Sequence, residues 1–172
     1  MVQSLFPPIL PKTVIAHDIK GNCHEVSTEL LKMRVSVYGI LTNTSGAVLL
    51  QRHPSANKFA LPGGGVDIGE TVTQALVREF KEETNLNIKI GQLLDICDDY
   101  FTHDGKYCQT VMIFYSVTSF GKNLINQNEE DVAETKFVTA DEISENLIQA
   151  IHWPIIKKHY LETSSKPTIT TK

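Results

Sequence analysis

The sequence predicts a single domain of the α/β or α+β class, and three observations lead to this prediction. The chain has 172 residues, of which 41% are hydrophobic and 21% are charged, as is typical of one soluble domain with its own core. Runs with strand character lie on both sides of an acid-rich, amphipathic helix expected at residues 72–84. A second helical segment follows near the end of the chain. Strands and helices in this order are expected to pack as layers around one core.

The charge and the cysteines exclude several classes of protein. The net charge of −4 argues against a surface built to bind nucleic acid. Cys23, Cys97 and Cys108 are scattered and form no C-x-x-C pair, so we expect neither a disulfide framework nor a zinc site. The same use of cysteine predicts a cytoplasmic location. Residues 1–12 lack the cationic segment of a signal peptide and are interrupted by prolines. No apolar run approaches the roughly 18 residues that span a bilayer, so no membrane partner is expected.

The first part of the chain allows two interpretations. Residues 1–12 are rich in proline and predict an extended arm. Gly21-Asn22 is a turn signal that predicts a β-hairpin within residues 13–33. The second half of this segment is equally compatible with a short helix that ends near Lys32.

The next elements are clearer. Polar and apolar residues alternate along residues 34–42, and many of them are β-branched, which predicts a strand. Residues 43–46 predict a turn. Residues 47–52 begin with four consecutive apolar side chains and are apolar enough to predict a strand in a central position. After a loop at residues 53–58, Phe59 to Pro62 lead into three consecutive glycines.

The helix that follows has well-defined ends. Thr71, with Gln74 three residues later, is a capping-box pattern and predicts the N-cap. The helix is then expected from about Val72 to Thr84. Asn85 follows it, and asparagine is the best substitute for glycine in the left-handed conformation that ends many helices.

Three carboxylates lie on the packed side of this helix. At about 100° per residue, Glu83 lies about 40° to one side of Glu79 and Glu82 about 60° to the other, next to the apolar stripe. An acidic run is more often a solvated face, but a solvated face should lie opposite the stripe. Partly desolvated carboxylates that repel one another need compensation. Arg78 can pair with one of them, and a divalent cation would satisfy the others, with oxygen ligands favouring Mg²⁺ or Mn²⁺.

Beyond the helix, the pattern returns to strands. Residues 88–100 have strand character with an interruption near Gly91, residues 101–106 form a turn, and residues 107–117 form the strongest strand of the chain. Polar residues 119–131 predict a loop, and residues 132–138 a final strand. Residues 146–160 predict a helix whose better-formed part starts at Pro154.

The stretch from the glycines to Leu86 resembles the Nudix box, G-x5-E-x7-R-E-U-x-E-E-x-G-U, where U is a bulky apolar residue. All of its specified positions but one are filled at the correct spacing; these are Gly64, Glu70, Arg78, Glu79, Phe80, Glu82, Glu83 and Leu86. The exception is Asn85 in place of glycine, and asparagine can adopt the left-handed conformation that this position requires. The resemblance implies the Nudix fold, an α/β/α sandwich around a mixed β-sheet. It also implies a Nudix domain at residues 34–161, an extension at 1–33, a short helix starting at residues 139–143, and a flexible tail at 162–172.

The resemblance implies a Mg²⁺-dependent hydrolase, with Mn²⁺ as an alternative, that cleaves the diphosphate linkage of a small nucleoside diphosphate derivative. We slightly favour a nucleoside triphosphate, because the core is compact. The alternative is a non-catalytic Nudix module that binds a nucleotide or a protein partner. A third option, an isomerase of isopentenyl diphosphate, is disfavoured by the intact box. The extension makes a homodimer possible.

The resemblance also implies roles for individual residues. Glu79, Glu82 and Glu83 are the expected catalytic and metal-binding residues, and one of them also acts as the base. The carbonyl of Gly63 is a further expected metal ligand, and Glu130 is the expected acid from a distant loop, although this loop is equally compatible with a solvated surface.

Four further residues are expected to support the site. Glu70 and Arg78 are expected to pair and to orient the loop against the helix. Arg52 is a candidate contact to substrate, with an ordinary surface arginine as the alternative. Tyr107, near Tyr100, Phe101 and His103 in the chain, is a candidate for stacking on a base or contacting a sugar, although aromatic residues are more often packing residues.

Overall fold

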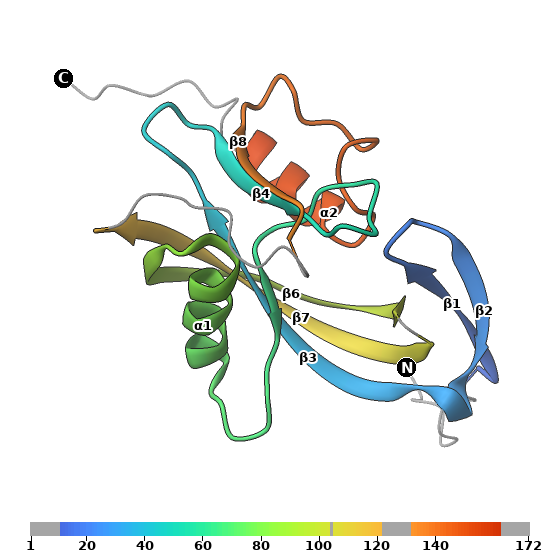
Figure 1. Cartoon of the computed structure of the whole chain (residues 1–172). Coiled ribbons are helices and arrows are strands. Elements are labelled where there is room, and N and C mark those ends of the chain that lie inside the picture. Colours follow the sequence, from blue (N-terminus) through green and yellow to red (C-terminus); the bar gives the residue numbers. More distant parts are fainter. Residues whose placement is uncertain (1–10, 104, 122–131, 163–172) are drawn as a thin grey trace, which may run out of the picture.

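The structure, a computed structural model, describes residues 11–103, 105–121 and 132–162. Figure 1 shows how the helices and strands are arranged. In chain order they are β1 (Thr13–Asp18), β2 (Cys23–Ser27), η1 (Thr28–Leu30), β3 (Lys32–Leu41), β4 (Val48–Arg52), β5 (Gly63–Gly65), α1 (Val72–Thr84), β6 (Asn87–His103), β7 (Lys106–Phe120), β8 (Glu134–Val138), α2 (Trp153–Ile156) and η2 (Lys157–Leu161). Within the described ranges, no helix has the length and apolar character needed to cross a membrane.

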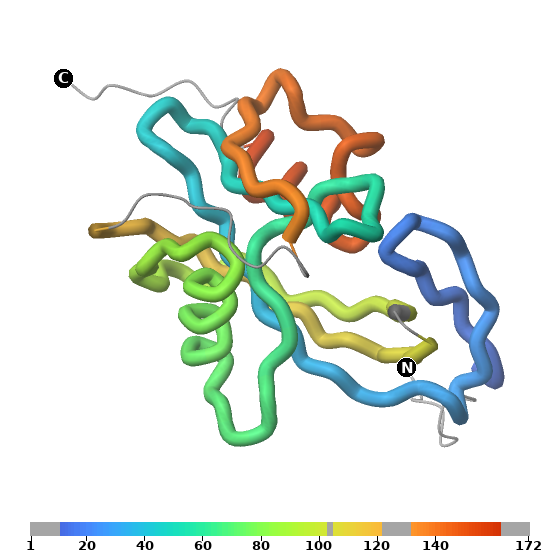
Figure 2. The backbone as a smooth tube through the Cα atoms, viewed as in Figure 1, coloured from blue at the N-terminus to red at the C-terminus, as the bar shows by residue number. Residues whose placement is uncertain are grey.

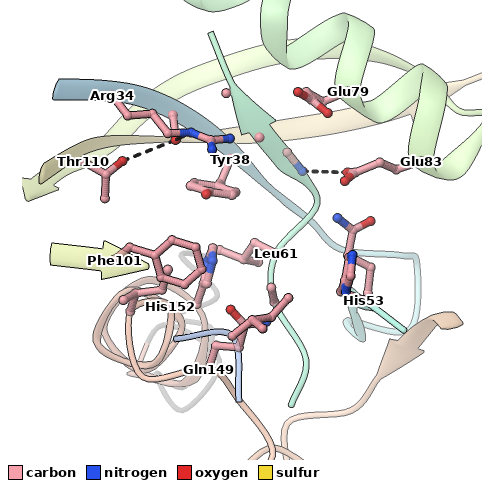
Figure 3. Close-up of a pocket in the computed structure, with 18 of the residues that line it drawn as sticks. Arg34, Tyr38, His53, Leu61, Glu79, Glu83, Phe101, Thr110, Gln149 and His152 are labelled. Carbon is pink, nitrogen blue, oxygen red and sulfur yellow. Dashed lines mark hydrogen bonds between the residues drawn. The ribbon is translucent and has the colours of Figure 1, made fainter. Parts of the chain in front are cut away.

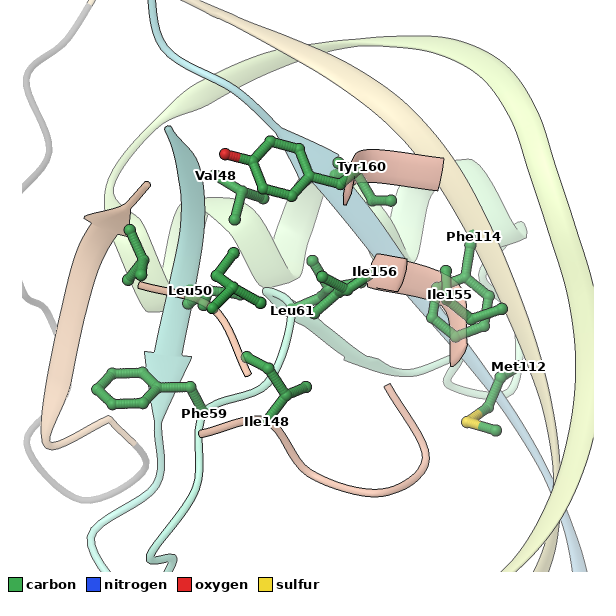
Figure 4. Packing of buried hydrophobic residues seen from close by; sticks show 13 residues of the cluster. Val48, Leu50, Phe59, Leu61, Met112, Phe114, Ile148, Ile155, Ile156 and Tyr160 are labelled. Carbon is green, nitrogen blue, oxygen red and sulfur yellow. The ribbon is translucent and has the colours of Figure 1, made fainter. Parts of the chain in front are cut away.

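A mixed six-stranded sheet forms the middle of the molecule, in the order β2-β1-β6-β7-β3-β5. Strands β3 and β7 run parallel, while β6 and β7 are antiparallel. Side chains alternate along β3, so Val37 faces a core cluster with Phe80 of α1, whereas Tyr38 packs against the cluster of Phe114 and Ile156. Figure 4 shows the second cluster, where α2 packs against β4 and the sheet. The predicted α/β/α sandwich around a mixed sheet is confirmed.

Strand β4 lies outside the six-stranded sheet, so the predicted central position is wrong. It pairs with β8 in a separate two-stranded sheet, and Gln51 at its end also forms an isolated bridge with Ala60. Val48 and Leu50 belong to the core cluster beside α2, and Leu49 belongs to the cluster beside α1. The run of four apolar residues, Ala47 to Leu50, therefore reflects burial on both faces of a two-stranded ribbon.

The sequence left two alternatives open for the chain before β3, a β-hairpin or a short helix in its second half. The structure shows the hairpin. Thr13 pairs with Ser27 and His17 with Cys23, and a single 3₁₀ turn follows as η1. The hairpin has a small core of its own around Ala16 and Val26. It joins the large sheet through parallel pairing of β1 with the end of β6, and Figure 2 shows it beside that end of the molecule.

Helix α1 begins and ends as predicted. The Thr71 hydroxyl accepts a hydrogen bond from the Gln74 amide, and the Gln74 side chain accepts one from the Thr71 amide. Asn85 adopts the left-handed conformation with φ 58°, and its side-chain oxygen accepts a hydrogen bond from Lys81 Nζ at 2.7 Å. Caps at both ends hold the acid-bearing helix in a defined register.

One helix prediction near the C-terminus is wrong, and another is confirmed only in part. At Thr139 the expected helix start is only a turn, in which Thr139 donates to the Glu142 carboxylate. The final helix starts at Trp153 with Pro154 in its first turn, which confirms the better-formed start expected at Pro154, whereas the stretch from residue 146 to residue 152 is not helical. The reason is tertiary pairing, since the Phe59 backbone donates to Leu147 and accepts from Gln149, at 2.8 Å in each case. These bonds draw residues 147–149 into an extended bridge that a helix cannot make.

Candidate active site

Strand β5 is three glycines at the edge of the large sheet, paired with β3 through Ser36, Val37 and Tyr38. A Cβ at Gly64 would lie 2.6 Å from the Glu79 carboxylate, and a Cβ at Gly65 would lie 2.8 Å from the Arg34 guanidinium. Gly63 has a backbone angle φ of 133°, which residues with a side chain rarely adopt. The absence of side chains thus lets Glu79 from α1 and Arg34 from β3 approach the same strand.

A cavity of about 290 Å³ opens beside this strand. One part of its wall carries the carboxylates of Glu79, Glu82 and Glu83 together with the three glycines. Figure 3 shows Glu79 and Glu83 on one side of the cavity and Phe101, Gln149 and His152 on another. The structure therefore brings together four of the predicted site residues, the three glutamates and Gly63.

Each glutamate has a partner that orients it. Glu83 Oε2 accepts a hydrogen bond from the Gly63 amide at 2.9 Å. Arg78 Nη1 lies 2.9 Å from a Glu79 oxygen and 3.1 Å from a Glu82 oxygen. Arg78 also pairs with Glu70 at 2.7 Å through Nε. The guanidinium thus joins the loop before α1 to the helix, which is the arrangement predicted for Glu70 and Arg78.

Burial and Arg78 act in opposite directions on these carboxylates. Burial raises the pKa of Glu79, and the neighbouring Arg78 guanidinium opposes this rise only in part. The hydrogen bonds from Arg78 lower the pKa of Glu70 to about 2. Glu70 is therefore a fixed anion, whereas an added cation would stabilise the charged form of Glu79.

The donors on this wall fit a divalent metal ion. Three carboxylates and the backbone of a glycine strand provide hard oxygen ligands, of the kind that Mg²⁺ and Mn²⁺ prefer, and the missing side chain at Gly64 lets the Glu79 carboxylate lie directly against this strand. In the described ranges, no three acidic, histidine or cysteine side chains converge tightly enough to hold an ion by themselves. Glu79 and Glu82 would therefore exchange contacts with Arg78 for contacts with an ion.

The rest of the cavity wall is mostly uncharged and includes several aromatic rings. Tyr38 stacks on Phe114, and His152 lies edge-on to Tyr38 with 4.5 Å between ring centroids. His152 is only 1% exposed, and burial lowers its pKa to about 3, so it is neutral. Phe101 from β6 and Ile19 from the turn between β1 and β2 complete this half. Phe101 was one of the aromatic candidates, whereas no feature of the sequence singled out Ile19 or His152.

Arg52 and Tyr107 do not line this cavity. Arg52 pairs with Glu134 at 3.2 Å and lies over the Phe59 ring. Tyr107 packs against the small core of the hairpin around Ala16. Their contacts with substrate stay predictions, and Glu130 lies outside the described residues.

Arg34 is a cavity residue that the sequence analysis missed. It lies on the same face of β3 as Ser36 and Tyr38, and all three line the cavity. The signal that could have identified it is the alternation of the strand, which places every second side chain on one face. The sequence alone did not show that this face meets the glutamates of α1.

Comparison with protein families gives one assignment. A model of the NUDIX domain matches residues 32–159. The crystal structure of a MutT NUDIX hydrolase from Burkholderia pseudomallei has a TM-score of 0.63 at 22% sequence identity, covering 74% of this chain and 98% of that one. This likeness concerns the fold.

Relatives in sequence carry different names. An ADP-ribose pyrophosphatase of Methanocaldococcus jannaschii is 47% identical over 64 residues, which are 36% of this chain and 38% of that protein. An RNA pyrophosphohydrolase of Psychrobacter cryohalolentis is 37% identical over 70 residues, 41% of this chain and 40% of that protein. The matched regions thus span about two fifths of these relatives.

Proposed function

The chain belongs to the Nudix family, and we propose that it is a pyrophosphohydrolase that uses Mg²⁺, or Mn²⁺ in its place, to cleave the diphosphate linkage of a nucleoside diphosphate derivative. The observation that carries this proposal is the shared wall of Glu79, Glu82, Glu83 and the glycine strand. A diphosphate repels an attacking hydroxide, so its hydrolysis requires counter-charge, a positioned water and a base. The carboxylates of this wall can provide the base, and the cation that they would hold would supply the counter-charge and help to position the water.

The glutamates are assigned distinct tasks. Glu79, Glu82 and Glu83, with the Gly63 carbonyl, would hold the metal ion. When bound, the ion supplies positive charge to the phosphate oxygens and makes water more acidic. Glu79, whose pKa is raised by burial, is suited to accept a proton from the attacking water.

The remaining groups orient this wall and bind the rest of the substrate. Arg78 holds Glu70 and the loop against α1, which keeps the glycine strand beside the helix. The uncharged half of the cavity around Tyr38 and Phe101 would bind the group attached to the diphosphate, since aromatic rings stack on a nucleobase.

A nucleoside triphosphate is the substrate we favour among several. The relatives named as ADP-ribose pyrophosphatase and RNA pyrophosphohydrolase make those substrates the first alternatives. We assign the reaction to residues 34–161 and regard residues 1–33 as an extension whose turn adds Ile19 to the cavity. A cytoplasmic location and a homodimer stay predictions.

A turnover screen with product identification tests the proposal. Nucleoside triphosphates, ADP-ribose and 5′-triphosphorylated RNA are incubated with the full chain and Mg²⁺, Mn²⁺ or EDTA. We expect metal-dependent cleavage of a diphosphate linkage in at least one of them. Binding of a nucleotide without turnover of any substrate in the panel would favour the non-catalytic module instead.

A further inference from the structure

Arg34 brings positive charge to an acidic cavity. Among the described side chains that line the cavity, it is the only lysine or arginine, and it shares the cavity with Glu79, Glu82 and Glu83. Its guanidinium lies directly against the bare backbone of β5, 2.8 Å from the position of a Cβ at Gly65. Figure 3 shows it beside Tyr38, with its terminal nitrogens directed toward the glycine strand.

Only one edge of this guanidinium is engaged. Arg34 Nε donates to Ser36 Oγ at 3.2 Å, and Ser36 Oγ lies 3.4 Å from Thr110 Oγ1. Ser36 and Thr110 are 2% and 4% exposed, so this pair of hydroxyls is a fixed support. Within the described residues, the two terminal amino groups of Arg34 make no hydrogen bond and no ion pair.

The contrast with the other two arginines is informative. Arg78 has its guanidinium occupied by Glu70, Glu79 and Glu82, and Arg52 is paired with Glu134. Arg34 alone of the three is held on one side and open on the other, toward a cavity that must accept an anion. The planar fork of a guanidinium matches two oxygens of a phosphate.

We propose that Arg34 binds a phosphoryl group of the substrate through its terminal amino groups, and that Ser36 and Thr110 are positioning residues for it. This inference rests on the proposed function, because it concerns the same cavity. The substrate's diphosphate then lies across the glycine strand, between the metal-binding carboxylates on one side and Arg34 on the other. The arrangement neutralises phosphate charge from two directions.

The test is titration calorimetry of the full chain with methylenediphosphonate, a diphosphate analogue that cannot be hydrolysed, in the presence of Mg²⁺. Arg34→Gln is expected to weaken binding by roughly tenfold to hundredfold, as expected when a charge-assisted hydrogen-bond pair is lost. Arg34→Lys should recover part of the affinity, since it keeps the charge and loses the fork. Lys32→Gln, which removes the same charge two positions earlier on β3 and outside the cavity, is the matched control.

A double-mutant cycle tests the positioning role of Ser36. Ser36→Ala should weaken binding by about twofold to tenfold, the range for one hydrogen bond. It should have no further effect in the Arg34→Gln background, because the hydrogen bond between Arg34 and Ser36 is already lost there. An equal loss in both backgrounds would show that Ser36 acts only through general structure and would overturn its assigned role.

Two outcomes would overturn the role of Arg34 itself. One is wild-type affinity in Arg34→Gln, and the other is an equal loss in Lys32→Gln, which would reveal an effect of net charge alone. Steady-state kinetics separate this inference from the proposed function. Turnover by the wild type with unchanged KM and kcat in Arg34→Gln refutes only the inference. Arg34-dependent binding in a protein that turns over no substrate refutes only the hydrolase.

Discussion

At the scale of single residues, the glycines of β5 let the charged groups of Glu79 and Arg34 approach the same strand. Each glycine has a different neighbour at the position of its missing Cβ, namely the backbone of β3 for Gly63, Glu79 for Gly64 and Arg34 for Gly65. A side chain at any of these positions would displace one of these groups. The three glycines are therefore required by contacts on both sides of the strand.

Gly64→Ala tests this requirement. The added methyl group would lie 2.6 Å from Glu79 Oε1, so the carboxylate has to move away from the cavity wall. We expect kcat/KM to fall by roughly tenfold to hundredfold, as when the support of a metal ligand is disturbed. Thermal unfolding should change little, because a flexible side chain can yield. Full activity in Gly64→Ala would show that the position of Glu79 is not critical.

The sequence predicted the residues of the box far better than those around them. Glu79, Glu82 and Glu83 were found because their angles on one helix depend only on local geometry. Arg34, Ile19 and His152 were missed because they reach the cavity from separate elements. Their convergence depends on how the strands pair, which no local pattern records.

At the scale of elements, helix α1 is defined by its caps. The reciprocal hydrogen bonds of Thr71 and Gln74 satisfy amides at the start of the helix. This local chemistry explains why both ends of α1 were predicted correctly. By contrast, the helical stretch predicted from residue 146 up to Pro154 does not form, because the bridge between Phe59 and residues 147–149 overrides the local preference.

Thr71→Ala should lower the free energy of unfolding by about 1 kcal/mol, the typical effect of losing an N-cap side chain. Thr71→Ser keeps the hydroxyl and is the matched control, expected to stay close to the wild type. Urea denaturation followed by circular dichroism measures both variants. An unchanged midpoint in Thr71→Ala would mean that the cap contributes nothing to stability.

At the scale of the whole molecule, an ion-pair cluster joins the last helical turns to the sheet. Asp95 of β6 accepts hydrogen bonds from Lys158 at 2.7 Å and from His159 at 2.9 Å, both in η2. These contacts hold the layer that carries His152 against the strand that carries Phe101. The uncharged half of the cavity thus depends on packing between layers.

This cluster predicts a dependence of stability on pH. Hydrogen bonds from Lys158 and His159 lower the pKa of Asp95 from 3.8 to about 2. The folded state therefore binds its proton less readily, so the stabilisation is complete above pH 3.8 and is lost as the pH falls toward 2. Because the cluster lies at the surface, with Lys158 exposed and Asp95 partly exposed, we expect about 1 kcal/mol or less. Urea denaturation in this pH range should show a smaller loss in Asp95→Asn than in the wild type, because Glu70, whose pKa is also lowered, contributes equally to both.

The central claim is that the carboxylates beside the glycine strand carry out the hydrolysis of a diphosphate linkage. The most direct test compares the rate of product release by the wild type and by Glu83→Gln, with Mg²⁺ and the best substrate of the screen. Glutamine keeps an oxygen that can accept the hydrogen bond from the Gly63 amide, so the fold is preserved while the negative charge is lost. Glu29→Gln, on the exposed turn η1, is the matched control. We expect the rate to fall by more than about 100-fold in Glu83→Gln, beyond the effect of losing a residue that only supports a ligand, and to stay unchanged in Glu29→Gln. Wild-type turnover by Glu83→Gln would contradict the assignment of the site.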